Sequence, residues 1–394
     1  MSLIGYENVR PWARSIRQKV TAREMPPWSA DPAHSVKFQN DPTLSAAEID
    51  VIAKWVDAGA PKGSDPIPAP PTFAEGWRDA SGRAPDYVLT LPAAYAVPAE
   101  STRETARMLD PTFYVKVPFD SDKWIRAAQA RPDQRGVVHY MDLNIVEFPA
   151  GTTPGADGQV PAAAAQAAQE IDFLTANFRP GAGYESFPTG AARRLPAGGN
   201  RYFQITMHYA PSGTAVQDRS TFGFWFGPTA PAAEIVKAPI TAGVVMAEGK
   251  EVLNGASSSM KGGATLKTKV YYPTVPANTP RFEVTSVQPF AVPTTIYELM
   301  PHAHNRATDF KYTLVFPDGR EQVLLTVPKY SEDWQFGYLL TEPIKVPAGS
   351  KIIVVAHYDN SASNRTVTTP SKPGSDMFMP TMQSSVEHAA VAVP

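Results

Sequence analysis

The chain has 394 residues, of which 43% are hydrophobic and 19% are charged, and its formal net charge is −2. These values indicate a globular protein of two or three domains and exclude the dense basic surface of a nucleic-acid-binding protein. The sequence contains no cysteine, which excludes disulfides, thiolate catalysis, Cys-ligated zinc and covalent haem attachment. No stretch has the ~18 apolar residues of a membrane span, and no signal segment opens the chain, so we expect a cytoplasmic protein or a processed or partial chain.

Two short helices are predicted in residues 1–60. The first has apolar residues four positions apart, at Trp12, Ile16 and Val20, and ends before Pro26. The second begins with a capping box, in which Ser45 is the N-cap and Glu48 lies three residues later, and it ends at Gly59. Two such helices bury little surface, so this unit needs a cofactor, the rest of the chain or a partner.

Residues 61–80 are rich in proline and predict a semi-rigid linker. After it the pattern changes to short runs typical of strands, at 87–91, 112–117, 136–148, 201–209 and 221–226 in a first domain (81–235). The second domain (236–394) has runs at 270–272, 281–287, 294–304, 310–316, 322–327, 335–340 and 351–358, with a hairpin turn at 317–319. A short helix is predicted at 161–169. The expected fold is mainly β: two tandem antiparallel β-sandwich, jelly-roll-like domains preceded by a short α-helical segment.

One sequence pattern occurs in both domains. Leu195-Pro196-Ala197-Gly198 leads through a strand to His208-Tyr209, and Val346-Pro347-Ala348-Gly349 leads through a strand to His357-Tyr358. The repetition predicts equivalent strands, or a duplication, with a histidine at the same strand end in each half.

Five of the seven histidines lie on predicted strands. His302 and His304 are one residue apart on the run 294–304, so their imidazoles should project from one face and could form half of a metal site. His139 and His208, taken singly, are more often buried or rim histidines than ligands. We interpret His357 as structural, positioned by the turn at 359–360. His34 and His388 lie in a loop and the tail and carry no argument.

A resemblance to a known family rests on several motifs in order. The second domain has them at 300–306 (MPHAHNR), 316–320 (FPDGR), 334–335 (WQ), 347–349 (PAG) and 356–361 (AHYDNS). The first domain has them at 137–139 (VVH), 207–211 (MHYAP) and 218–220 (DRS). Together they resemble the copper type II, ascorbate-dependent monooxygenases, with the peptidylglycine and dopamine hydroxylase fold, in the form of secreted bacterial proteins. The segments 23–28 (REMPPW), 31–32 and 44–61 resemble the end of a cytochrome c domain often fused in front.

The resemblance implies one copper in each sandwich. In the second domain it implies His302, His304 and a methionine as ligands, with Met377 as the best match and Met379 as a competitor. A thioether beside two imidazoles suits a site that holds both Cu(I) and Cu(II). The family uses this copper to activate oxygen for C–H hydroxylation, while the other copper supplies an electron.

Two parts of the chain depart from the family pattern. The family has two adjacent histidines where this chain has His139-Tyr140, which leaves His139 and His208 as the candidate ligands of a weaker first-domain site. Met25 corresponds to the axial methionine of the cytochrome, but the Cys-x-x-Cys-His segment is absent, so covalent haem cannot attach. The helical start is therefore interpreted as a cytochrome remnant, by truncation, processing or gene decay.

Both departures affect residues that the family uses to deliver electrons. We therefore expect a non-catalytic or degenerate copper monooxygenase-like protein, a pseudoenzyme that acts as a periplasmic or extracellular binding or structural subunit on a protein partner or a membrane redox or photosynthetic complex. The alternative is an active monooxygenase that uses O₂ and an external reductant on a small-molecule substrate at His302, His304 and Met377. A third interpretation is a metal-free carbohydrate- or peptide-binding sandwich protein.

Overall fold

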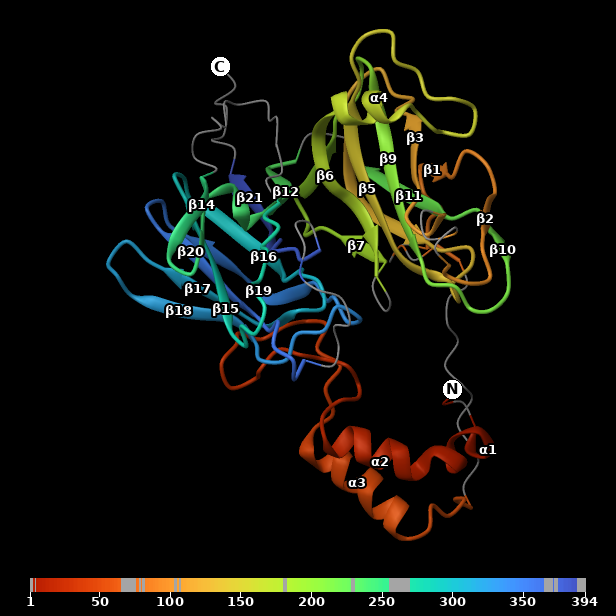
Figure 1. Cartoon of the computed structure of the whole chain (residues 1–394), viewed down its shortest axis with the longest axis vertical. Helices are drawn as coiled ribbons and strands as arrows, with labels where there is room; N and C mark the ends of the chain where they lie inside the picture. Colours follow the sequence, from red (N-terminus) through yellow and green to blue (C-terminus); the bar gives the residue numbers. More distant parts are fainter. Residues whose placement is uncertain are drawn as a thin grey trace.

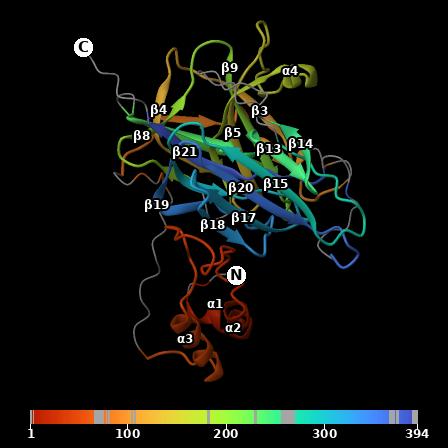
Figure 2. The same cartoon turned by 90° about the vertical axis from the view of Figure 1, so that its left-hand side faces the viewer.

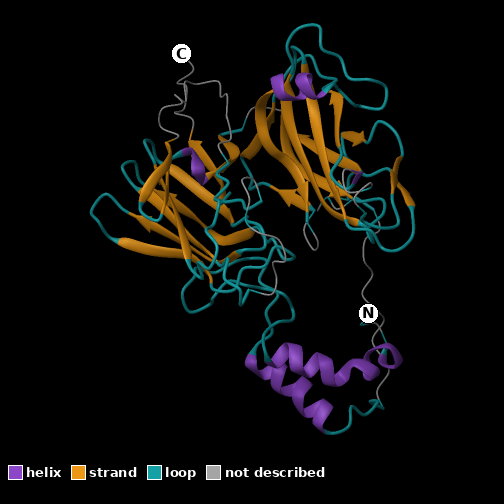
Figure 3. Ribbon diagram, in the orientation of Figure 1, coloured by secondary structure: helices purple, strands orange, loops and turns teal. Residues whose placement is uncertain are grey.

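The computed structural model describes residues 3, 5–64, 76–77, 79, 82–102, 105, 108–179, 183–227, 231–254, 270–364, 371 and 375–387. The fold class expected from the sequence is confirmed, because two antiparallel β-sandwiches in tandem follow a short helical unit (Figure 3). His388 and most of the proline-rich linker, 65–75, lie outside the described residues.

The helical unit contains both predicted helices. Its elements are α1 (Tyr6–Val9), η1 (Arg10–Trp12), α2 (Ala13–Thr21) and α3 (Ala46–Asp57). The capping box forms as expected, since the Ser45 hydroxyl accepts from the Glu48 N–H at 3.2 Å and the Glu48 carboxylate accepts from the Ser45 N–H at 2.7 Å. In two views at right angles the helices stand apart from the sheets (Figure 1, Figure 2).

The segment between α2 and α3 attaches this unit to the second sandwich. Phe38 forms an isolated β-bridge with Leu340, and the Asp31 N–H donates to the Thr326 carbonyl at 2.8 Å. The Trp28 ring lies 4.8 Å from the Tyr338 ring, centroid to centroid. The connecting segment, rather than the helices, therefore provides the packing that the sequence could not assign.

The first sandwich packs a sheet of order β3-β9-β5-β6 against part of a longer sheet. The strands of the short sheet are β3 (Thr112–Lys116), β5 (Val138–Glu147), β6 (Gln169–Phe178) and β9 (Arg201–Tyr209). The facing strands are β1 (Tyr87–Thr90), β4 (Lys123–Arg131), β7 (Tyr184–Ser186), β8 (Ala191–Leu195) and β11 (Thr221–Gly227), with a small ribbon of β2 (Tyr95–Val97) and β10 (Val216–Asp218) beside them. The helix predicted at 161–169 is α4 (Ala162–Ala167).

The second sandwich has a sheet of order β14-β13-β15-β20-β17-β18. Its strands are β13 (Val244–Ala247), β14 (Lys250–Asn254), β15 (Phe282–Pro289), β17 (Ala307–Val315), β18 (Glu321–Val327) and β20 (Lys351–Tyr358), and the short η3 (Ile240–Ala242) precedes them. The turn predicted at 317–319 joins β17 to β18, whose ends pair at Val315 and Glu321. The opposite layer contains β16 (Thr294–Met300), β19 (Tyr338–Val346) and β21 (Thr381–Glu387).

One sheet runs through both sandwiches. Among the described residues its order is β1-β11-β4-β8-β12-β21-β16-β19, with β7 paired to β4. The linking strand β12 (Ala233–Pro239) pairs in parallel with β8 and antiparallel with β21. The boundary expected at 235/236 falls inside β12, so the two halves are joined by backbone hydrogen bonds on both sides of that point.

Three strands of the second domain differ from their expected bounds. The run 294–304 is a strand only to Met300, the run 270–272 contributes only an isolated bridge at Tyr271, and the run 335–340 becomes a strand from Tyr338. His302 and His304 therefore follow a strand instead of lying on it, which corrects the expectation. The chain leaves β16 at Pro301, which lacks the N–H that a ladder needs.

The repeated motif occupies equivalent positions. Each motif glycine has a positive φ, 74° at Gly198 and 82° at Gly349, and leads into a strand that lies between two neighbours, β9 and β20 respectively. The imidazole at each strand end bonds to an aspartate, His208 to Asp110 and His357 to Asp309. The turn at 359–360, which the sequence suggested, is therefore not the hydrogen-bond partner of the His357 ring.

Candidate metal centre

His302 and His304 lie at the edge of the second sandwich that faces the first. The residue between them, Ala303, forms an isolated bridge with Phe378, and the Met379 N–H donates to the His302 carbonyl at 2.9 Å. Ala303 and Phe378 are fully buried in the core of the second sandwich. Because side chains alternate across an extended pair, the residues on either side of this bridge project from the opposite face.

The bridge brings two methionines to the same face. In its antiparallel register, Met379 lies opposite His302 and Met377 lies opposite His304. Directly opposed Cβ atoms lie about 5 Å apart. Within the part of the chain that the structure describes, no group of three His, Cys, Asp or Glu residues is placed to hold a metal. A metal here would therefore depend on a thioether, and we call His302, His304, Met377 and Met379 the second-sandwich group.

Both imidazoles of the second-sandwich group are held through Nδ1. The Nδ1 of His302 lies 2.6 Å from Oε1 of Gln335, and the Nδ1 of His304 lies 2.9 Å from the backbone carbonyl of Ser375. The Gln335 amide nitrogen donates to the Glu332 carbonyl at 2.9 Å, which fixes its oxygen toward His302. Since both acceptors are oxygens, each Nδ1 carries the proton and each Nε2 carries the lone pair.

Burial keeps His302 neutral. The side chain is 8% exposed, and burial, followed by the nearby Arg179 cation, lowers its pKa to about 4. The two rings lie 5.9 Å apart, centroid to centroid, with their planes at 85°. Two imidazoles whose Nδ1 atoms are both held, beside a thioether, form a donor set that fits copper in either oxidation state.

A buried ion pair supports the same edge. Arg306 Nη1 lies 2.9 Å from Oδ1 of Asp376, and these side chains are 3% and 1% exposed. The Ser371 hydroxyl donates to the same carboxylate at 2.7 Å. Because Asp376 directly precedes Met377, this pair fixes the methionine segment against the turn that follows the histidines.

The first sandwich contains a second cluster: His139 and Tyr140 of β5 with His208 of β9, which we call the first-sandwich group. The His139 and His208 rings lie 5.3 Å apart, and the Tyr140 ring stacks on His208 at 4.9 Å and 9°. An irregularity of register between Val138 and Tyr140 turns both neighbours toward His208. The structure thus brings together the two histidines that the sequence could assess only singly.

The hydrogen bonds of the first-sandwich group differ from those of the other group. His208 Nδ1 bonds to the Asp110 carboxylate, whose side chain is 54% exposed. His139 Nδ1 is buried and has no hydrogen-bond partner. Burial, and next the neighbouring His208, lower the pKa of His139. Burial raises the pKa of Tyr140 to about 12, so at neutral pH this side chain is a neutral phenol and a poor ligand.

Arg179 connects the two groups and was not singled out from the sequence. Its guanidinium lies 4.6 Å from the centroid of the Tyr140 ring and forms two hydrogen bonds to Asp142, at 2.7 and 3.1 Å. The same cation lowers the pKa of both His139 and His302, although burial is the larger cause for each. The histidines of the two sandwiches therefore face one inter-sandwich space that contains a buried positive charge.

Glu332 lies in the same space. Burial raises its pKa, and His304 of the second sandwich and His208 of the first both oppose that rise. Signals for Glu332 and Arg179 were absent from the sequence because each acts across the interface between sandwiches, which local patterns do not encode.

Met25, the residue that matches an axial methionine, is 41% exposed. It lines a cavity of about 520 Å³ together with Trp28 and Trp334. The second helix beside it buries none of its residues. Met25 thus lines a cavity that none of the candidate histidine ligands lines, and the cytochrome origin of this unit stays a prediction.

No protein-family model and no curated protein matches the chain. Among solved structures, the chain is similar to the tandem CBM22 domains of Paenibacillus barcinonensis Xyn10C (12% identity, 71% of this chain and 83% of that one, TM-score 0.20). It is also similar to PNGF-II (10%, 77% and 66%, 0.27) and to allantoicase of Saccharomyces cerevisiae (8%, 67% and 74%, 0.20). Since all these TM-scores are below 0.5, they carry no argument, and the monooxygenase resemblance stays a prediction.

Proposed function

We propose that the chain is a copper monooxygenase-like protein that has lost two-copper catalysis and acts as an extracytoplasmic binding or structural subunit. The observation that carries the proposal is the set of rings in the first-sandwich group. The His139 and His208 rings lie 5.3 Å apart, and the third ring is the Tyr140 phenol, whose pKa burial raises to about 12. Two imidazoles beside a neutral phenol form a weaker copper site than three imidazoles would form.

The hydrogen bonds of the first-sandwich group support the same conclusion. His208 is tied to a carboxylate, and Tyr140, in the position of a third ligand, has a raised pKa. Without a competent copper here, the chain lacks the electron source that the resemblance assigns to the first sandwich.

The helical unit supports a partner. Trp12 is 51% exposed and Val51 is 66% exposed, and both lie on helices that the sandwiches do not cover (Figure 1). We propose that these uncovered helices are the part of the chain that contacts a protein partner. No helix among the described residues has the length and apolar character needed to cross a membrane.

The second candidate function is a single-copper monooxygenase with an external reductant, and the observation that favours it is the geometry of the second-sandwich group. Both Nδ1 atoms are held by oxygen acceptors, which leaves Nε2 of His302 and of His304 for a metal, with Met377 across the bridge. Copper in this place would supply oxygen activation. The surrounding residues would hold both rings in place, keep His302 neutral and exclude bulk water from it.

Copper loading of the purified full chain tests both candidates. We expect no more than one Cu(II) per chain, with an electron paramagnetic resonance signal that disappears in His302→Ala and persists in His139→Ala. With ascorbate, oxygen consumption should not exceed that of a free-copper blank. Oxygen consumption above the blank that His302→Ala abolishes would overturn the subunit proposal, in favour of the single-copper enzyme if one copper is bound and of a two-copper enzyme if two are bound. Absence of any bound copper would favour the metal-free sandwich protein.

A further inference from the structure

Strand β6 of the first sandwich contains a bulge. One residue of β5, Asn144, lies opposite three residues of β6, 173–175, because the register of the two strands shifts there. In the middle of the bulge, Leu174 has a φ of 48°, in the left-handed region that a residue with a Cβ rarely adopts. Such a conformation persists only where the surrounding contacts hold it.

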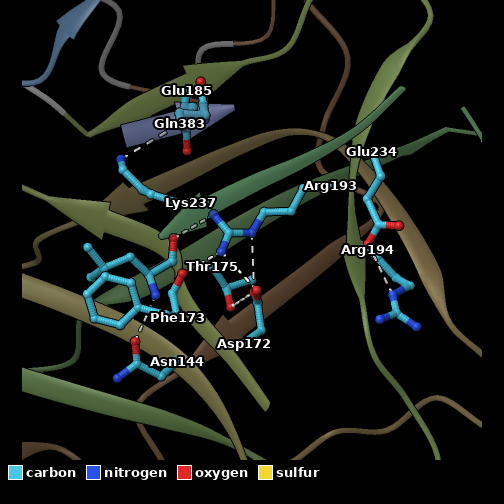
Figure 4. A network of polar contacts seen from close by, with 11 residues as sticks. Asn144, Asp172, Phe173, Thr175, Glu185, Arg193, Arg194, Glu234, Lys237 and Gln383 are labelled. Atoms are coloured by element: carbon cyan, nitrogen blue, oxygen red, sulfur yellow. Dashed lines mark hydrogen bonds and ion pairs between the residues drawn. The ribbon is translucent and has the colours of Figure 1, made fainter. Parts of the chain in front are cut away.

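Buried side chains hold the bulge. Arg193 of β8 is 1% exposed, and its guanidinium donates to the backbone carbonyls of Phe173 and Leu174. It also bonds to both carboxylate oxygens of Asp172, at 2.9 and 3.2 Å, and Figure 4 shows it beside Asp172 and Phe173. The Leu174 N–H donates to the side-chain oxygen of Asn144 at 2.8 Å. These side chains therefore replace hydrogen bonds that a regular strand pair would form.

The side chains of the bulge pack across the boundary between the two sandwiches. Phe173 and Leu174 are 7% and 2% exposed and form a cluster with Met379 of the second domain, which we call the bulge cluster. Met377 packs against the bulge cluster. Since both methionines belong to the second-sandwich group, the first sandwich forms part of the surroundings of a candidate copper ligand. Bulges often re-aim side chains beside functional sites.

The second sandwich fixes the backbone of Met377. The Tyr358 hydroxyl donates to the Met377 carbonyl at 2.7 Å, and the preceding residue, Asp376, pairs with Arg306 at 2.9 Å. A fixed backbone still leaves a methionine several rotatable side-chain bonds. The bulge cluster therefore acts on the part of Met377 that the backbone contacts leave free, the rotamer that places the sulfur atom.

We propose that the bulge of β6 positions the Met377 thioether for Cu(I), with Leu174 as the positioning residue and Arg193 as the residue that holds the bulge. The inference rests on the copper site proposed above for the second-sandwich group. Leu174 restricts the rotamers of Met377 in the folded chain, so less side-chain freedom is lost when the metal binds, and the affinity rises. Copper binding in the second sandwich thus depends on a strand of the first.

Cu(I) affinity of the full chain, measured by competition with a chelator, tests the positioning. Leu174→Ala should weaken Cu(I) binding about fivefold, equal to about 1 kcal/mol. Leu174→Met fills a similar volume and should restore the affinity. In the Met377→Leu background, Leu174→Ala should have no further effect, because both changes act through one ligand.

Leu89→Ala is the matched control. Leu89 lies on β1 and is buried in the core of the same sandwich, at 1% exposed. Its truncation should lower the free energy of unfolding and leave the Cu(I) affinity unchanged. If Leu174→Ala fails to fold, Leu174→Gly replaces it, because glycine adopts a positive φ without strain. An unchanged Cu(I) affinity in the Leu174 variant, or an equal loss in the Met377→Leu background, overturns the inference.

A second readout needs no copper. In the metal-free chain with ¹³C-labelled methionine methyl groups, Leu174→Ala should shift the NMR resonances of both Met377 and Met379, and Leu89→Ala should shift neither. The single Met→Leu variants assign the two resonances. If the wild type binds no copper but both resonances shift, the copper proposal fails and the positioning of Met377 by the bulge stands. A Met377 resonance that does not shift in Leu174→Ala overturns the inference whether or not copper binds.

Discussion

The two histidine groups differ in what holds their rings. In the second-sandwich group both Nδ1 atoms bond to uncharged oxygens, at 2.6 Å for His302 and 2.9 Å for His304. In the first-sandwich group His208 bonds to a carboxylate and the Nδ1 of His139 bonds to nothing. The first arrangement fixes the tautomer and orientation that metal binding requires, whereas the second fixes only one ring.

The groups also differ in their surroundings. The second-sandwich group is supported by the buried Arg306–Asp376 pair, while the first-sandwich group is supported by Asp110, half exposed, and carries the Arg179 cation on its tyrosine. The comparison teaches that the fold can bring two histidines together in each sandwich and still hold their rings differently. What decides competence here is the set of neighbours, not the ligand residue.

The largest effect should come from the ion pair beside the second-sandwich group. Arg306→Met leaves the Asp376 carboxylate buried without its cation, so we expect the free energy of unfolding to fall by about 3–5 kcal/mol. Asp110→Asn, at the partly exposed pair with His208, should cost less than about 1 kcal/mol. Urea denaturation of both variants measures the difference. Losses of equal size in the two variants would show that the difference in burial does not make the two ion pairs differ in their contribution to stability.

The hydrogen bond from His302 to Gln335 should set copper affinity. Gln335→Leu removes the acceptor of His302 Nδ1, and second-layer changes of this kind lower metal affinity by about 10–100-fold. Gln322→Leu, on β18 away from the group, is the matched control. Competition with a copper chelator gives both affinities. If Gln335→Leu binds copper as tightly as the wild type, the ring orientation is set elsewhere.

The two methionines should separate into a ligand and a packing residue. Met379 is 8% exposed and forms a cluster with Phe173 and Leu174 of the first sandwich. Met377 packs against the same cluster, but it is less buried and lies opposite His304. We expect Met377→Leu to weaken Cu(I) binding about tenfold, or about 1.4 kcal/mol. Met379→Leu should change the free energy of unfolding by less than about 1.5 kcal/mol. If the Cu(I) affinity falls only in Met379→Leu, Met379 is the ligand and Met377 is the packing residue.

Much of the fold could be predicted because its signals are local. The capping box at Ser45 and Glu48, the turn at 317–319 and the runs that became β9 and β20 all form where the sequence indicates. Two of the strands that were missed, β12 and β6, carry polar residues whose partners are distant in sequence. In β12, Lys237 pairs with Glu298 of β16, and in β6, Asp172 pairs with Arg193 of β8. Such strands lose their alternation of apolar and polar residues, so periodicity cannot identify them.

The candidate site also contains residues that the sequence identified and residues that it could not identify. His302 and His304 were singled out because two ligands one residue apart are visible in the sequence, although they lie beyond the end of β16. The sequence did not single out Gln335, Arg179 and Glu332. Each of them lies near a histidine only in the folded chain, so no regular spacing in the sequence connects the two. The resemblance identified ligand candidates, and only the three-dimensional neighbours distinguish the two groups.

The smallest expected effect is on the pH dependence of stability. It arises at Asp309, the partner of His357, which is the second-domain equivalent of His208. Burial is the largest single influence and would raise the pKa of Asp309, but the hydrogen bonds with His357 and Thr308 and the charges of His357 and Arg281 together outweigh it, so this pKa is lower than the ordinary value. As pH falls, the unfolded chain takes up the proton first, so stability from Asp309 is present above about pH 4 and is lost as pH falls through the lowered pKa. Because the carboxylate is partly exposed, the loss should be at most about 1 kcal/mol. Asp309→Asn should flatten this part of the unfolding profile, while Asp120→Asn, at an exposed position, should not. A profile of unchanged slope in Asp309→Asn would show that the His357 pair, like the His208 pair, contributes little to the stability of its sandwich.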